Sequence, residues 1–349
     1  MSSLENQSSH SESAALMERI LYEVKRVVVG QDRFLERVMV ALLAQGHLLV
    51  EGVPGLAKTL TVKTLADAVQ GSFKRIQFTP DLVPADLIGT RIYNQKSGEF
   101  STVKGPVFAN LLLADEINRA PAKVQSALLE VMQERQVTFA GETHKVPNPF
   151  VVMATQNPIE TEGTYTLPEA QVDRFMMKVL VDYPSDEEEF VIVQRVTGEK
   201  LDLMPVATIA QLQVLQRACR DVYVDPALIQ YAVKVVAATR DPGRAGLSDL
   251  KKFITYGASP RGTINMVEGA RALALMRGRR YVLTEDMTDL IHDVLRHRLS
   301  LTYEALSDGV SADAILSKII GKVAAPVKPL QSATSATSAT SANQAQRAA

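Results

Sequence analysis

A glycine-rich loop between a short apolar run and a helix is the first feature of this chain that could do chemistry. The run at residues 47–50 leads into Glu51-Gly52-Val53-Pro54-Gly55-Leu56-Ala57-Lys58-Thr59-Leu60. A loop at such a junction points backbone N–H groups and a helix N-terminus at an anion. We expect Lys58 to contact the β- and γ-phosphates of a nucleotide and the Thr59 hydroxyl to hold Mg²⁺. The alternative is a glycine-rich turn with a surface lysine.

One residue of this loop departs from the strict phosphate-loop pattern. Ala57 stands where a glycine usually precedes the lysine. Because alanine tolerates right-handed helical dihedrals, we expect the loop to close there nonetheless.

Two carboxylates, Asp115 and Glu116, end the apolar run at residues 111–114. Buried strands rarely end in a carboxylate pair without a cation or a catalytic task. Asp115 suits the water shell of Mg²⁺, and Glu116 suits the base that orients and activates an attacking water. A helix N-cap would explain Asp115 but not Glu116. The strand candidate at residues 75–79 separates the two motifs, as expected if another strand is inserted between the lysine strand and the acidic strand.

Two polar residues further along the chain fit the same site. Asn157 follows the apolar run at residues 150–155. A short amide there could position the lytic water or contact the γ-phosphate, although Asn-Pro also favours a simple turn. Arg261 stands at the second position of a predicted helix, where a cation opposes the macrodipole. We therefore expect an anion beside Arg261, and the γ-phosphate is the candidate.

Arg174 lies just before the last predicted strand. An arginine there can reach a neighbouring subunit's nucleotide and neutralise charge in the transition state, an effect of about 10³ to 10⁵ in rate. The alternative is an ion pair with Asp173 or Glu169, which stabilises by less than about 1 kcal/mol if exposed.

The elements that must position these residues form an alternating pattern. Strand candidates occur at residues 47–50, 75–79, 111–114, 150–155 and 176–182. Strands alternating with helices predict an α/β core with a mostly parallel sheet covered on both faces. Two segments break the alternation and are predicted as hairpins: residues 91–103, turning at Ser97-Gly98, and residues 136–146, turning at Ala140-Gly141.

After residue 184 the pattern becomes helical. Ser185 followed by Glu188 is a capping box, and Asp225-Pro226 and Ser259-Pro260 each place an N-cap before a proline. Thr284 precedes another apolar-periodic run, residues 287–299. We predict a disordered N-terminus (1–13), an αβ core (14–184), a linker helix (185–204), an all-helical domain (205–323) and a low-complexity, Ser-Ala-Thr-rich tail (324–349).

Composition excludes several classes of protein. The 349 residues are 46% hydrophobic and 22% charged with a net charge of -1, which gives no global sign of a nucleic-acid binder. The single Cys219 rules out an internal disulfide and a cysteine-rich zinc site. We expect a soluble, cytoplasmic protein, because no signal-peptide pattern opens the chain and its apolar runs are too short to cross a bilayer.

The motifs together resemble the AAA+ superfamily, and more narrowly its MoxR family, from about residue 28 to residue 322. The strings that carry the resemblance are Val29-Gly30-Gln31, Gly52-Val53-Pro54-Gly55-Leu56-Ala57-Lys58-Thr59, Asp115-Glu116-Ile117-Asn118-Arg119-Ala120-Pro121, Ala154-Thr155-Gln156-Asn157-Pro158 and Gly257-Ala258-Ser259-Pro260-Arg261. Alanine at position 57 is itself usual in MoxR-type loops.

The resemblance implies a P-loop AAA+ core followed by an all-α lid domain, with ATP and Mg²⁺ bound between core and lid. It implies roles for single residues: Lys58 and Thr59 as Walker A, Asp115 and Glu116 as Walker B, Asn157 as sensor 1, Arg174 as the arginine finger in trans and Arg261 as sensor 2. Val29, Gly30 and Gln31 fall where the family holds adenine. Arg119 is either a second interface residue or a solvated helix start.

The resemblance also implies an assembly and partners. The hairpins match the helix-2 insert and the pre-sensor-1 insert, which line the central pore of related rings. We expect a homo-oligomeric ring, a hexamer, that remodels, assembles or activates client proteins, with a von Willebrand factor A domain protein as a further partner. The alternatives are a nucleic-acid motor, disfavoured because the hairpins carry few basic residues and no aromatic-basic interleaving, and a nucleotide-gated scaffold, which would not need Glu116. A GTPase is disfavoured because no Asn-Lys-x-Asp motif occurs.

Overall fold

The chain folds into two compact units, which are described separately. The computed structural model describes residues 2–53, 55–96, 98–157, 163–198 and 202–326, with the side chains of these residues from 12 onward other than Asn94. The first unit is Ala15–Gln216, and the second is Arg217–Ala349 together with Met1–Ala14. In the part of the chain that is described, no helix has the length and apolar character needed to cross a membrane.

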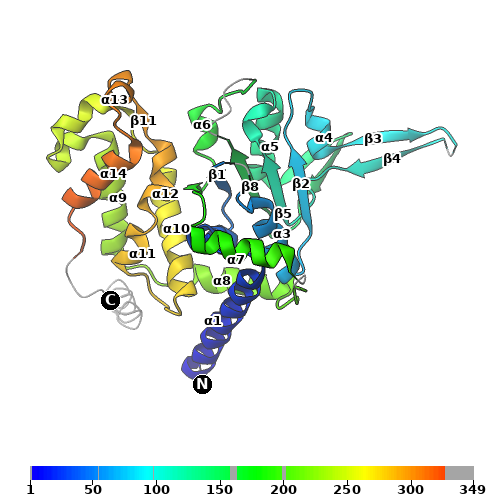
Figure 1. Cartoon of the computed structure of the whole chain (residues 1–349), viewed down its shortest axis with the longest axis horizontal. Helices are drawn as coiled ribbons and strands as arrows, with labels where there is room; N and C mark the ends of the chain where they lie inside the picture. Colours follow the sequence, from blue (N-terminus) through cyan, green and yellow to red (C-terminus); the bar gives the residue numbers. More distant parts are fainter. Residues whose placement is uncertain (1, 54, 97, 158–162, 199–201, 327–349) are drawn as a thin grey trace, which may run out of the picture. The chain divides into compact units, whose positions relative to one another are not determined.

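A five-stranded parallel sheet forms the centre of the first unit (Figure 1). Its strands are β1 (Leu48–Glu51), β2 (Phe73–Gln77), β5 (Leu111–Asp115), β8 (Val151–Gln156) and β9 (Met177–Leu180). Their order is β2-β5-β8-β1-β9, and every neighbouring pair is parallel. The five predicted strands are confirmed, with ends shifted by one or two residues. The strand inserted between the lysine strand and the acidic strand is β8.

Helices cover this sheet because its central strands are apolar on both faces. One face packs against α5 (Ala122–Glu134) in a single buried cluster, to which alternate strand residues contribute: Leu112, Ala114, Val152 and Ala154. The helix α3 (Lys58–Ala68) contacts β2 and β5, and α2 (Asp32–Ala44) contacts β9. The sheet thus holds the ends of β1, β5 and β8 at fixed spacing along one edge.

Both predicted hairpins are present. β3 (Gly89–Asn94) pairs with β4 (Glu99–Lys104), and β6 (Gln136–Phe139) pairs with β7 (Glu142–Lys145), both antiparallel. At the second turn Ala140 and Gly141 both have positive φ, 54° and 83°, as a tight two-residue hairpin turn requires. Of the other predicted turn, Gly98 is described and Ser97 lies outside the described residues. The β3–β4 hairpin projects away from the sheet (Figure 1).

Short helices complete the unit: α4 (Pro84–Ile88), η1 (Ile117–Arg119) and α6 (Glu169–Val172). The linker helix predicted over residues 185–204 is α7 (Asp186–Thr197), which ends at Thr197 and not at residue 204. Its capping box is confirmed, since the Ser185 side chain accepts from Glu188 N and the Glu188 carboxylate accepts from Ser185 N.

The N-terminus differs from the expectation of a disordered segment over residues 1–13. Helix α1 (Ser2–Val27) begins at Ser2, so residues 2–13 are helical. Its later turns are anchored by the buried Met17, Ile20 and Val24. Once such a helix is nucleated, each further residue extends it at little cost.

The first unit also extends past the predicted end of the core at residue 184. Val206 N and Ala207 N both donate to Ala68 O, at 3.0 and 3.1 Å. The Gln216 amide, on α8 (Ile209–Arg220), donates to Leu42 O at 2.7 Å. These contacts join residues 205–216 to the core, so the boundary falls within α8 and not at residue 205.

The second unit is mainly helical, as predicted. Its helices are α9 (Pro226–Arg240), η2 (Pro242–Ala245), η3 (Ser248–Phe253), α10 (Pro260–Met276), α11 (Thr284–Thr288), α12 (Ile291–Leu295), η4 (Arg296–Arg298), α13 (Tyr303–Ser307) and α14 (Ala312–Lys322). The Asp225 and Ser259 N-caps are confirmed. Two details differ: the run at residues 287–299 is divided between α11, α12 and η4, and β10 (Ile254–Tyr256) pairs with β11 (Ser300–Leu301). Of the predicted tail, residues 327–349 lie outside the described part.

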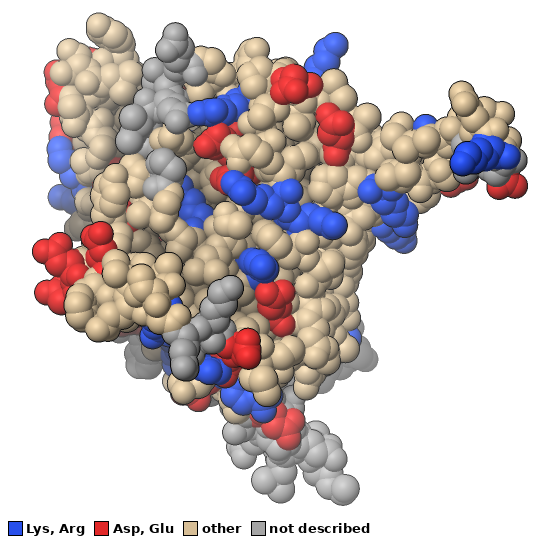
Figure 2. Space-filling model, turned by 45° about the vertical axis from the view of Figure 1, so that its right-hand side comes forward, with Lys and Arg blue, Asp and Glu red and all other residues tan. Residues whose placement is uncertain are grey.

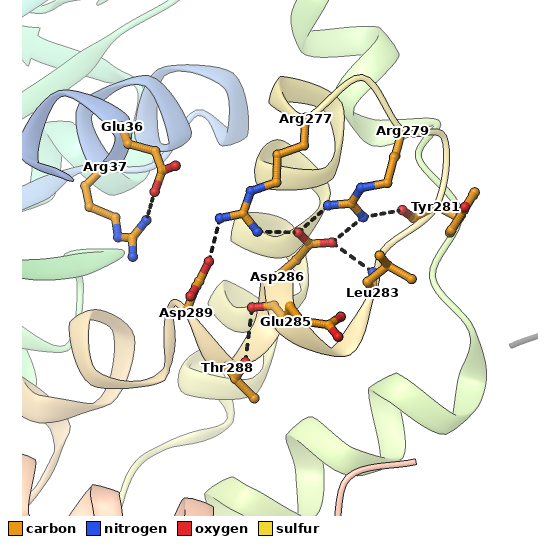
Figure 3. Close-up of polar contacts among 10 residues, drawn as sticks. All are labelled: Glu36, Arg37, Arg277, Arg279, Tyr281, Leu283, Glu285, Asp286, Thr288 and Asp289. Atoms are coloured by element: carbon orange, nitrogen blue, oxygen red, sulfur yellow. Dashed lines mark hydrogen bonds and ion pairs between the residues drawn. The ribbon is translucent and has the colours of Figure 1, made fainter. Parts of the chain in front are cut away.

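A buried carboxylate fixes the turn between α10 and α11 (Figure 3). Asp286 is fully buried and pairs with Arg277 at 2.8 Å and Arg279 at 2.6 Å. It also accepts from Leu283 N at 2.8 Å. Because a buried carboxylate is costly unless it is paired and hydrogen-bonded, these contacts explain how Asp286 is accommodated in the interior.

Candidate functional site

The phosphate loop connects the end of β1 at Glu51 to the start of α3 at Lys58. Pro54 lies outside the described residues. Gly52 is required by close packing, because a Cβ there would lie 2.4 Å from Val181 O. The loop therefore runs tightly against the chain that follows β9, and its N–H groups and the first turn of α3 lie at the edge of the sheet where the strands end.

The expected conformation of Ala57 is wrong. Its φ is 53° and its ψ is 16°, which is left-handed and not right-handed helical. A left-handed residue with a Cβ costs roughly 1–2 kcal/mol. The position before Lys58 therefore has the backbone that favours glycine, and alanine occupies it under strain.

Lys58 lies half-buried at the first position of α3. Its Nζ donates to Gly52 O at 2.6 Å, so the side chain folds back over its own loop. Burial lowers the pKa of Lys58 below its ordinary value, while the carboxylates of Asp115, Glu116 and Glu51 oppose that shift. An anion beside this ammonium would therefore be strongly favoured.

Asp115 and Glu116 lie at the same edge of the sheet as the loop. Asp115 is the last residue of β5, whose neighbour β8 separates it from β1. The Thr155 hydroxyl, from β8, donates to Asp115 Oδ1 at 2.5 Å and accepts from Glu116 N at 2.9 Å. Glu116 has a left-handed backbone with φ 56°, which turns the chain sharply at the end of the strand. Such strain often occurs at functional positions.

Arg119 forms an ion pair within its own chain, and its side chain is 39% exposed. Its Nε lies 2.9 Å from Glu116 Oε2 in the same chain. This pairing was not predicted, although the sequence places the opposite charges of Glu116 and Arg119 at i,i+3 spacing.

A cavity of about 280 Å³ adjoins the loop. Several residues predicted to hold the nucleotide line it: Val29, Gln31, Gly55, Leu56, Ala57 and Leu60. Its volume is near the lower end of ligand pockets, which begin at about 300 Å³. Gly30 does not line the cavity and lies against α7, since a Cβ on it would be 2.7 Å from the Glu188 carboxyl carbon. Gln31 donates to Asp182 O at 2.8 Å and so ties the cavity lining to the chain after β9.

The other residues that line the cavity were missed by sequence reasoning. They are Val27, Tyr183, Pro184, Glu189, Ile192, Arg195 and Val196. Arg195 donates to Lys25 O at 3.1 Å, which joins α7 to the end of α1. Phe190, Val191, Ile192 and Val193 are consecutive apolar residues, so no helical period indicated which face of α7 lines the cavity.

The remaining predicted residues divide into two groups. Asn157 directly follows β8, next to Asp115 and Glu116 at the edge where the strands end. Arg174 lies at the opposite edge, before the start of β9 at Met177. Arg261 belongs to the second unit, where its N–H donates to the Ser259 cap at 3.2 Å.

The donor set fits a nucleotide with a divalent cation. The loop offers N–H groups, an ammonium and the Thr59 hydroxyl to an anion, and the facing strand ends offer two carboxylates to a hard cation. A parallel sheet with a phosphate loop after its β1 strand and an acidic pair on the strand two places away defines a P-loop ATPase of the AAA+ class.

Comparisons with known proteins agree with this class. Residues 47–177 match the ATPase family associated with various cellular activities, and residues 248–319 match the AAA lid domain. The chain is similar to a crystal structure of a candidate ATPase from Cytophaga hutchinsonii, with a TM-score of 0.89, 45% identity and coverage of 93% of this chain and 99% of that one.

Two named relatives show to which family within the AAA+ class the chain belongs. The chain is 55% identical over 310 residues to Chaperone MoxR1 of Mycobacterium tuberculosis, covering 89% of this chain and 82% of that protein. It is 32% identical over 339 residues to Protein MoxR of Methylorubrum extorquens, covering 90% and 96%. The chain belongs to the MoxR family of AAA+ ATPases.

Proposed function

We propose that this protein hydrolyses Mg-ATP and uses the energy to remodel, assemble or activate client proteins. The observation that carries the proposal is the meeting of two motifs at one edge of the sheet. The loop ending in Lys58 and Thr59 follows β1, Asp115 ends β5 and Glu116 follows it, and only β8 lies between the two strands. Both motifs can contact one triphosphate from opposite sides.

Each residue has a distinct task in this proposal. Loop N–H groups and Lys58 hold the phosphates, and Thr59 and Asp115 hold Mg²⁺, which would neutralise charge on the β- and γ-phosphates. Glu116 accepts the proton of the attacking water, and Asn157 orients that water. The adenine lies in the cavity between residues 29–31 and α7, whose apolar positions 192 and 196 would contact the flat base.

Arg174 is proposed to act on the nucleotide of a neighbouring subunit. It precedes β9, whose four residues span roughly 13 Å, whereas the phosphate loop lies beyond the other end of the sheet. Arg174 and the phosphate loop of the same chain lie at opposite edges of the sheet. This separation supports a role for Arg174 at the nucleotide of a neighbouring subunit. A ring of identical subunits, a hexamer, would supply each site with such an arginine, and Arg261 of the lid would contact the γ-phosphate as sensor 2.

The hairpins are proposed to contact the client. All six residues of β4 are exposed, and the β3–β4 hairpin leaves apolar side chains at the surface: Ile92, Tyr93, Phe100 and Val103. Figure 2 shows this arm extending from the body, with both basic and acidic side chains at its far end and basic side chains where it joins the body. A relative named a chaperone supports a protein client. A von Willebrand factor A domain protein remains the proposed further partner.

One face of the β3–β4 hairpin carries a basic residue beside two aromatic residues. Arg91 lies 5.0 Å above the Phe100 ring, and Tyr93 lies 5.0 Å from the same ring. The linear sequence hides this because the residues come from two strands. The face fits an extended chain, and a gel shift with single-stranded nucleic acid that weakens with salt would favour the motor over the remodelling enzyme.

The test of the proposal is ATP turnover together with partner capture. The parent should release phosphate from ATP, and Glu116→Gln should bind ATP with turnover reduced at least about 100-fold, since the general base is lost. In the presence of ATP, Glu116→Gln should capture a client that the same protein carrying Phe100→Ala does not. Parental turnover equal to that of Glu116→Gln would contradict the enzymatic part, and capture independent of ATP would contradict the remodelling part.

A further inference from the structure

Both oxygens of Asp115 are already occupied by groups of the protein itself. Arg75, on β2, donates from Nη2 and Nε to Oδ2 at 2.7 and 3.1 Å. The Thr155 hydroxyl donates to Oδ1 at 2.5 Å. The carboxylate expected to face a metal therefore has a guanidinium on one oxygen and a hydroxyl on the other.

Glu116 is held in a similar way. Its Oε2 accepts from Gln77 Nε2 at 2.7 Å and lies 2.9 Å from Arg119 Nε. Gln77 Oε1 in turn accepts from Arg75 Nη2 at 3.0 Å, which links the two carboxylates into one network. Two adjacent negative charges are thus balanced by two guanidinium groups.

Strand register explains this arrangement. Gln77 is the cross-strand partner of Asp115, and Arg75 lies two residues earlier on the same face of β2. The Arg75 side chain is 49% exposed and that of Asp115 is 18% exposed. Arg75 can therefore turn into solvent, while Asp115 stays anchored by the strand and by Thr155.

We propose that Arg75 is the counter-ion of the Asp115 carboxylate in the nucleotide-free protein. The Arg75 guanidinium would leave Asp115 when Mg²⁺ binds, and this competition would set the affinity of the site for the metal. This proposal rests on the proposed function. Arg75 and the divalent cation compete for Asp115 Oδ2, because a carboxylate oxygen that accepts two guanidinium N–H groups is screened from a second cation. Arg75 acts through Asp115, whose carboxylate it holds in the nucleotide-free protein.

A competing explanation predicts the opposite change in metal affinity when Arg75 is replaced. If Arg75 orients Asp115 toward the metal, its removal loosens the carboxylate and weakens metal binding. If Arg75 competes with the metal, its removal tightens metal binding. Only the direction of the change distinguishes the two.

The experiment measures Mn²⁺ binding to the protein–ADP complex from the electron paramagnetic resonance signal of free Mn²⁺. The variants are Arg75→Gln and Arg75→Lys, and the control is Lys74→Gln, which removes the same charge from the neighbouring exposed position of β2. We expect Arg75→Gln to lower the Mn²⁺ dissociation constant roughly fivefold, as the loss of one partly exposed ion pair would. Arg75→Lys, which cannot donate as a planar fork, should lower it less.

Each outcome decides. Tighter Mn²⁺ binding in Arg75→Gln than in Lys74→Gln supports the proposal, and an equal or weaker affinity overturns it. If Arg75→Gln does not fold, the Arg75→Lys result carries the same comparison. A parent that binds ADP and Mn²⁺, and loses both with Lys58→Ala, separates failure of this inference from failure of the proposed function. A parent that binds neither overturns both.

Discussion

The left-handed backbone of Ala57 stores strain inside the phosphate loop itself. Ala57→Gly should remove roughly 1–2 kcal/mol of steric strain from the folded protein. It should also cost about 0.5–1 kcal/mol of stability, because glycine loses more backbone entropy on folding. The nucleotide-free protein should therefore melt about 1–4 °C higher, with nucleotide affinity retained. Thermal melts with and without ATP test this.

Gln70→Gly is the matched control, because Gln70 also has a positive φ, 50°, but lies at the far end of α3. It should raise the melting temperature without touching the nucleotide site. A lower melting temperature for Ala57→Gly would show that the left-handed geometry costs little there.

Lys58 is costly to the empty protein. Burial lowers the pKa of Lys58 in the folded protein below its pKa in the unfolded chain. Below the folded-state pKa, the charged ammonium therefore reduces the free energy of unfolding. This loss of stability disappears as the pH rises from the folded-state pKa to the unfolded-state pKa. Lys58→Met should therefore raise the melting temperature of the nucleotide-free protein near pH 7, with an advantage that shrinks at high pH.

The same variant should lose protection by nucleotide. ATP at 100 times its dissociation constant should stabilise the parent by about 2.7 kcal/mol and Lys58→Met not at all. Lys63→Met, at an exposed position of the same helix, is the control and should keep full protection. If ATP stabilised both variants equally, Lys58 would not be part of the nucleotide-binding site.

At the scale of elements, α7 forms one wall of the cavity and has no fully buried residue. Ile192→Asp should weaken adenine-nucleotide binding about tenfold, or 1.4 kcal/mol, because a carboxylate replaces an apolar contact with the base. Val193→Asp is the control, since Val193 is 54% exposed and does not line the cavity. Titration with a fluorescent ADP analogue measures both, and equal losses would place the base elsewhere.

Local patterns determine much of this arrangement, and that part was predictable. The strands β1, β2, β5, β8 and β9 are short apolar runs, and the caps at Ser185, Asp225 and Ser259 are set by side chains within three residues. The contacts of Arg75 and Gln77 with the acidic pair were not predictable. They depend on which strands are neighbours and in what register, information that a single strand does not contain.

Backbone conformation was the other source of error. Ala57 was expected to be right-handed because alanine tolerates that region, but the closed loop holds this residue in the left-handed region. Likewise, Arg91, Tyr93 and Phe100 form one face only through the pairing of β3 with β4.

For the whole molecule, catalysis in trans requires contact between subunits. Arg174→Ala should keep ATP affinity but lose turnover by about 10³-fold or more. Mixing it with Glu116→Gln protein should restore part of the activity, because some interfaces then pair an intact Glu116 with an intact Arg174. Phosphate release across a range of mixing ratios measures this, and a strictly additive result would contradict catalysis in trans.

The most direct measurement of the central claim is a crystal structure with Mg²⁺ and a non-hydrolysable ATP analogue. The account predicts that Lys58 Nζ leaves Gly52 O for the phosphates, that Thr59 and Asp115 face the metal, and that Glu116 lies beside the γ-phosphate. A triphosphate bound away from the turn between β1 and α3, or a metal that Asp115 does not face, would contradict it.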